Sequence, residues 1–143
     1  MSDPITREPQ YEMLVELRRK KGLATLGLTT NQMWHDDPRH LCFHLARYKF
    51  VAKLLSGKAK VLEIGCGDAF GTRLVQQEVG SVHAIDFDPI FVNDVNDRMD
   101  DKWRFECEVH DILNGPAPGG EVDAAYSIDL LEHIPIDNED QFM

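Results

Sequence analysis

Two glycines that follow a predicted strand are the strongest chemical signal in the sequence. Val61 to Ile64 is a short apolar run of the strand type, and Gly65 and Gly67 come directly after it. Glycines in these positions allow a tight turn and let the backbone approach a ligand at the N-terminus of the following helix. The pattern therefore predicts a site for a nucleotide-like ligand.

The side chains around this loop indicate the charge of that ligand. A dinucleotide fingerprint G-x-G-x-x-G would need glycine where Phe70 stands, and a phosphate-binding P-loop would need a G-K-[ST] sequence that does not follow. Glu63 and Asp68 place carboxylates in the strand and in the loop. Carboxylates repel a pyrophosphate but tolerate a ligand with a positive centre and a ribose. S-adenosylmethionine, with a cationic sulfonium and a cationic amino group, fits this description.

Residues 60–133 resemble the amino-terminal half of a class I, Rossmann-like S-adenosylmethionine-dependent methyltransferase of the small-molecule type. The family's first motif, (V/L)-L-(D/E)-x-G-x-G-x-G, is matched from Val61 onward, with Ala69 in place of the third glycine. Asp86 lies 21 residues beyond Gly65, where the family has an acid that bonds both ribose hydroxyls. By the same resemblance, Asp111 would accept a hydrogen bond from the adenine amino group.

The resemblance implies a complete set of cofactor contacts. Phe87 would lie next to the adenine, Ile112 would pack on its ring, and the segment 122–133 is similar to the strand-four segment of members that methylate small molecules. S-adenosylmethionine, or its product S-adenosylhomocysteine, is therefore expected to bind to Glu63, Gly65, Cys66, Gly67, Asp86, Phe87, Asp111, Ile112 and Ser127.

His133 is the predicted catalytic residue. Methyl transfer is an in-line displacement in which the enzyme mainly positions the partners and can remove a proton. Imidazole suits the role of base toward a hydroxyl acceptor, although a His that only caps the loop or the next helix is an equal alternative. The expected activity is methyl transfer to a small molecule, at a hydroxyl oxygen. A non-catalytic module that binds the cofactor or its product is the alternative, and a nucleotide-dependent oxidoreductase is disfavoured by Phe70 and Glu63.

Strand and helix patterns alternate along the chain from Lys60 onward. This alternation predicts an α/β fold with parallel strands and helical crossovers, preceded by a helical cap. Residues 1–57 are the predicted N-terminal cap segment, and residues 58–143 the Rossmann-like domain, incomplete at its C-terminus. In the cap, helices are expected at 8–21 and 38–55, with a loop over 23–34. In the domain, strands are expected at 61–64, 82–86, 103–109 and 122–128, with helices at 72–78 and 91–99.

Composition and charge exclude several partners. The chain has 143 residues and a formal net charge of −10, and residues 58–143 carry nineteen acidic against six basic side chains. This balance disfavours nucleic acid, whose binding is dominated by Lys and Arg that neutralise phosphates.

No apolar stretch approaches the roughly 20 residues of a membrane-spanning helix, and no signal sequence is evident, so a cytoplasmic location is expected. Three cysteines without a zinc-type spacing predict reduced thiols, and the pair His40 and His44 is too little for a metal site.

The resemblance also predicts an open sheet edge. A complete fold of this family has strands in the order 3-2-1-4-5-7-6, and the sequence supplies the first four. An uncovered edge on strand four is an association hazard, so the 143-residue chain is expected to self-associate or to be marginally stable.

Overall fold

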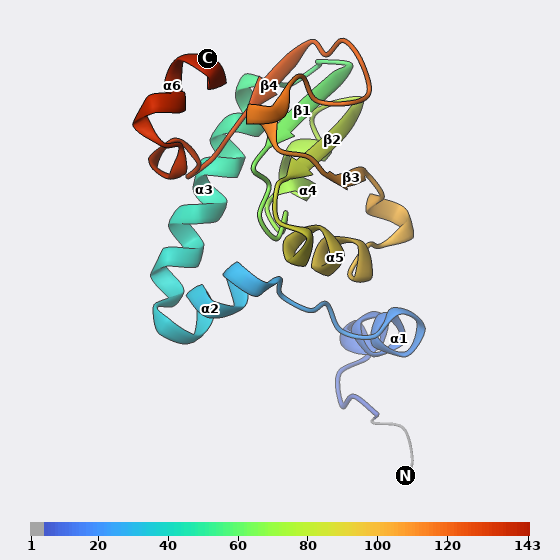
Figure 1. Ribbon diagram of the computed structural model, residues 1–143. Helices are drawn as coiled ribbons and strands as arrows, with labels where there is room; N and C mark the ends of the chain where they lie inside the picture. Colours follow the sequence, from blue (N-terminus) through green and yellow to red (C-terminus); the bar gives the residue numbers. More distant parts are fainter. Residues whose placement is uncertain (1–4) are drawn as a thin grey trace.

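The computed structural model describes residues 5–143, which form an α/β fold built on a four-stranded parallel sheet (Figure 1). The strands lie in the order β3-β2-β1-β4, as the resemblance predicts. The register places Val61 opposite Val82 on one side and Ala124 on the other. The strands are β1 (Lys60–Ile64), β2 (Ser81–Asp86), β3 (Glu106–Val109) and β4 (Ala124–Tyr126).

In the described part of the chain, three α-helices come before the first strand in the sequence, and the others lie between or after the strands. The long helix α3 runs beside the sheet, whereas α1 lies apart from it (Figure 1). No helix within residues 5–143 is long and apolar enough to cross a membrane. The division at residues 57 and 58 stays a prediction. The helices are α1 (Glu12–Lys21), α2 (Leu28–Asp36), α3 (Pro38–Leu54), α4 (Thr72–Gln76), α5 (Pro89–Asp97) and α6 (Glu139–Phe142).

Local capping explains where two of these helices begin. Asp37 accepts a hydrogen bond from the backbone N–H of Arg39, and Pro38 occupies the first helical position of α3. Asp88 caps α5 in the same way, with Pro89 in the first position. A short acceptor side chain followed by proline satisfies a free N–H and fixes the first φ angle, so the predicted start of α3 is confirmed.

The loop predicted over residues 23–34 is wrong from Leu28 onward, where α2 begins. Its Thr-Thr-Asn start has a low helix propensity, which favoured a loop. The Thr30 hydroxyl accepts from the N–H of Gly27 (2.9 Å), and the Asp68 carboxylate accepts from both the N–H (2.8 Å) and the hydroxyl (2.9 Å) of Thr30. A side chain from the glycine loop therefore completes the first turn of α2.

The last two strands are shorter than predicted. Trp103 lies in a 3-10 turn, so β3 begins only at Glu106, and β4 keeps three residues. Asp123, just before β4, accepts from the N–H groups of Ala59 and Lys60 (2.9 and 2.8 Å). Its side chain therefore joins the starts of β4 and β1 where further ladder pairing was expected.

Candidate functional site

The glycine loop after β1 makes the tight turn that its sequence predicts. Gly65 and Gly67 have φ angles of +69° and +53°, which favour glycine. The N–H groups of Gly65 and Cys66 both donate to the carbonyl of Ile85 (2.9 and 3.0 Å), so the loop turns over the end of β2. Ala69 also has a positive φ, +47°, which costs an alanine about 1 kcal/mol more than the glycine of the family motif.

Asp86 lies at the end of β2, against this loop. Its Oδ2 accepts from the N–H of Gly67 (2.8 Å), and its Oδ1 accepts from the N–H of Asp88 (3.0 Å). A carboxylate offers about four acceptor positions, so two remain for a ligand. The backbone of the loop and the predicted ribose acid are thus in direct contact.

A cavity of about 220 Å³ opens beside Gly65, and four of the nine predicted cofactor contacts line it: Gly65, Phe87, Asp111 and Ile112. Phe87, one of the lining residues, is 68% exposed, so its side chain is accessible to a ligand. Asp111 accepts from the N–H of Leu113 at Oδ1 (2.9 Å) and from the side-chain amide of Asn114 at Oδ2 (3.4 Å). Apolar walls with one carboxylate suit a flat ring that carries a hydrogen-bond donor. The lining residues are Ile64, Gly65, Phe87, His110, Asp111, Ile112, Leu113, Leu130, His133, Ile134 and Pro135.

His133, from the segment after β4, also lines this cavity. It ends a 3-10 turn, Leu131–His133, and its N–H donates to the carbonyl of Leu130 (2.9 Å). The side chain is exposed. The structure therefore brings the predicted base together with Phe87 and Asp111, and its catalytic role stays a prediction.

Glu63 lies beneath the loop and is fully buried. Tyr48 of α3 donates to its Oε1 (2.7 Å), and Tyr126 of β4 (2.9 Å) and Thr72 of α4 both donate to its Oε2. Burial raises the pKa of Glu63 to about 7, although the three hydroxyl donors act to lower it. Burial, followed by the nearby charge of Glu63, also raises the pKa values of Tyr48 and Tyr126. Direct contact of Glu63 with a ligand stays a prediction. The three hydroxyls around it come from three other elements and could not be predicted from the local sequence.

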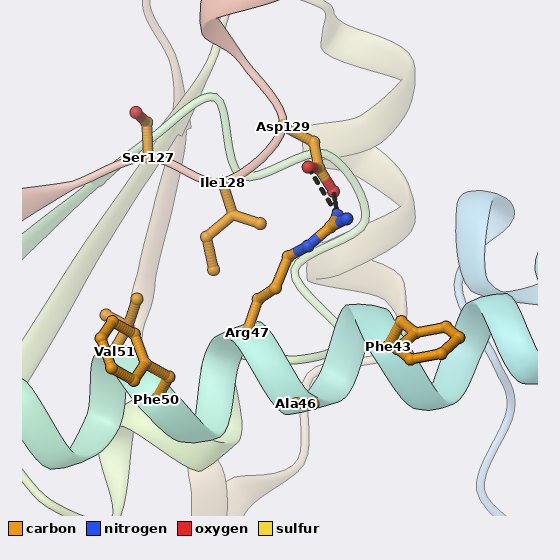
Figure 2. A pocket seen from close by; sticks show the side chains of 8 residues that line it. All are labelled: Phe43, Ala46, Arg47, Phe50, Val51, Ser127, Ile128 and Asp129. Carbon is orange, nitrogen blue, oxygen red and sulfur yellow. Dashed lines mark hydrogen bonds and ion pairs between the residues drawn. The ribbon is translucent and has the colours of Figure 1, made fainter.

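A second, more open pocket of about 560 Å³ lies between α3 and the segment after β4 (Figure 2). Arg47 points from α3 toward Asp129 and donates to its carboxylate (2.6 Å). Asp129 has a φ of +53°, an uncommon conformation for a non-glycine residue. Ser127 lines this pocket and not the smaller cavity, and its cofactor contact stays a prediction. The lining residues are Phe43, Ala46, Arg47, Phe50, Val51, Ser127, Ile128 and Asp129.

Within residues 5–143, no group of three His, Cys, Asp or Glu side chains is arranged to hold a metal ion.

Comparisons with known proteins agree with this geometry. A family profile described as "Methyltransferase domain" matches residues 61–143. Phosphoethanolamine N-methyltransferase of Plasmodium falciparum is 31% identical over 88 residues, which cover 61% of this chain and 33% of that protein. The chain thus spans about a third of the length of this curated relative.

Solved structures share the fold at low sequence identity. Magnesium protoporphyrin IX methyltransferase from Synechocystis PCC 6803, with bound SAH, has a TM-score of 0.60 and 16% identity, over 93% of this chain and 62% of that one. A TehB-like SAM-dependent methyltransferase from Corynebacterium glutamicum has a TM-score of 0.57 and 18% identity, over 78% and 61% of the two chains. The chain spans less than two thirds of either structure.

Proposed function

The chain belongs to the methyltransferase domain family, in its class I, Rossmann-like form, and we propose that it binds S-adenosylmethionine for methyl transfer to a small-molecule acceptor. One observation carries the proposal. Asp86 holds the N–H of Gly67 at the carboxyl end of β2, which is where ligands of open α/β sheets bind. The cavity lined by Gly65, Phe87 and Asp111 lies beside that contact.

The residues present fit this cofactor. Asp86 keeps about two acceptor positions, which match the two ribose hydroxyls. Phe87 and Ile112 would contact the adenine ring. Asp111 Oδ2, which keeps acceptor capacity beside its 3.4 Å contact with the Asn114 side chain, would accept from the adenine amino group. When bound, the cofactor supplies an electrophilic methyl group on a cationic sulfur.

The proposed acceptor is a hydroxyl, and His133 would accept its proton. His133 is exposed at the cavity and free to exchange protons with solvent afterwards, which supports this assignment. The likeness to a phosphoethanolamine N-methyltransferase supports a small molecule and makes an amine the alternative acceptor. A module that binds the cofactor without turnover is the second candidate, because the chain spans only part of that relative.

We also propose self-association and a cytoplasmic location. Within the described residues, β4 is an edge strand that pairs with β1 alone. Phe43, Phe50 and Leu54 are each about two-thirds exposed on α3. Exposed apolar side chains beside an open edge favour contact with another chain, and a second copy of this chain is the proposed partner.

Calorimetry of the whole chain tests the cofactor site. We expect S-adenosylmethionine and S-adenosylhomocysteine to bind and NAD to show no heat. Asp86→Ala should remove binding, whereas Asp97→Ala, which removes an exposed aspartate on α5, should not. Thermal melts of both variants would show that they are folded. Equal binding to both variants, or a preference for NAD, would refute the proposed site.

Activity separates the two candidate functions. Transfer of labelled methyl from S-adenosylmethionine should be measured against panels of small hydroxyl and amine compounds. Turnover that is lost in His133→Ala with cofactor affinity unchanged supports the enzyme and the base. Tight binding without turnover on any panel member supports the binding module.

A further inference from the structure

Two cysteine thiols meet directly beneath the glycine loop. Cys66 stands between the two loop glycines, and Cys107 is on β3, two strands away from β1. Their sulfur atoms are 3.9 Å apart. Both cysteines are free in this structure.

The fold explains how residues from β1 and β3 come so close. The N–H of Cys66 donates to Ile85 on β2, so the loop crosses the end of that strand. Ala84 of β2 is paired with Cys107 and is fully buried in the same cluster as Cys66. Because Ala84 has only a methyl group, it leaves room for the two sulfurs to meet above it.

We propose that Cys66 and Cys107 form a reversible disulfide that acts as an oxidative modification site and reshapes the glycine loop. The effect on the cofactor rests on the proposed function, whereas formation of the bond does not. The co-reactant is a peroxide. Disulfides that form in a reducing cytosol are usually transient and serve catalysis or redox sensing, so the proposed bond is regulatory and not structural.

The chemistry assigns different roles to the two thiols. Cys107 is partly exposed, so its sulfur attacks the peroxide O–O bond, becomes a sulfenic acid and releases one water. Contact with Cys107 and burial raise the pKa of Cys66, so Cys66 is the poorer first nucleophile. Cys66 then attacks the Cys107 sulfur, and the sulfenic oxygen leaves with a proton as the second water. Two thiols and one peroxide thus give one disulfide and two waters.

The bond would displace the loop. A disulfide has its sulfurs about 2 Å apart, so the two atoms must close by about 2 Å. Cys66 lies in a buried cluster with Ala69 and Val95, and Cys107 packs against this cluster. Because the cluster is closely packed, the sulfurs cannot close this distance by rotation of one side chain without a shift of the backbone. We expect Gly67 to lose its hydrogen bond to Asp86 and the affinity for S-adenosylhomocysteine to fall about tenfold, as for one hydrogen bond.

The experiment uses the whole chain with Cys42→Ser, because exposed Cys42 would otherwise form bonds between chains. The matched control adds Cys107→Ser. Each protein is treated with hydrogen peroxide and then with dithiothreitol. Intact mass, peptide mapping, amide hydrogen exchange over residues 65–71 and calorimetry with S-adenosylhomocysteine are measured at each stage.

The expected result is a mass lower by two hydrogen atoms, a Cys66–Cys107 peptide, altered exchange in the loop and weaker binding. Dithiothreitol should reverse all four, and the control should show none of them. Oxidation of Cys107 without the cross-link, or a cross-link that leaves exchange in the loop unchanged, would overturn the proposal. If the reduced protein does not bind S-adenosylhomocysteine, the proposed function fails, and the disulfide is judged by mass and exchange alone.

Discussion

The buried carboxyl of Glu63 should make the stability of the protein depend on pH above pH 5. It is held by hydroxyls of Tyr48, Thr72 and Tyr126, and its pKa is about 7 against an ordinary 4.5. The folded state therefore binds this proton more tightly than the unfolded state. The stabilisation is complete below pH 4.5 and is lost as the pH rises through 7.

The size of the effect follows from the two pKa values. A difference between 4.5 and about 7 corresponds to about 3 kcal/mol of unfolding free energy in total. Between pH 5 and pH 8 the loss is about 2–3 kcal/mol, because only a small part of it has already occurred at pH 5. The three hydroxyl donors do not reverse the sign, since burial is the largest cause of the raised pKa.

Glu63→Gln isolates this group from every other titration. Glutamine keeps the shape of the side chain and stays neutral, so histidines and other carboxyls contribute equally to both proteins. Urea unfolding should be followed by circular dichroism at pH 5, 6, 7 and 8. We expect the stability of the wild type to fall relative to the variant by about 2–3 kcal/mol over this range. Parallel pH curves for the two proteins would refute the reasoning.

Three further changes test other contacts. Thr30→Val removes a buried hydroxyl donor from Asp68 and should lower the unfolding free energy by about 1–3 kcal/mol in urea, whereas Thr29→Val should have a smaller effect. Arg47→Met breaks an ion pair that is about half exposed, so less than about 1 kcal/mol should be lost, and a larger loss would contradict this view of the pair. The wild type should associate with rising concentration in sedimentation, and Phe50→Lys should weaken this; a monomer at all concentrations would count against the exposed edge.

Local sequence patterns were enough to predict the first two strands and the glycine loop, whereas the strand order came from the family resemblance. The apolar run before Gly65 fixes a strand and a turn, and Asp37 with Pro38 fixes a helix start, because each depends on neighbours in sequence. The helix that begins at Leu28 was missed because its first turn is completed by Asp68, 38 positions beyond Thr30. No periodicity in residues 23–34 could reveal that partner.

The acids of the site also differ in whether their partners are near or distant in the sequence. Glu63, Asp86 and Asp111 lie near the carboxyl ends of strands and were predicted to contact the cofactor, whereas Asp68 was predicted only to be a carboxylate of the glycine loop. The structure divides them, because Asp86 borders the loop and Asp111 lines the cavity, whereas Asp68 is buried against α2. Glu63 is buried against a tyrosine of α3. Two acids near the ligand loop thus hold the N-terminal helices in place, so any movement of α2 or α3 must alter the hydrogen bonds that support the loop from below.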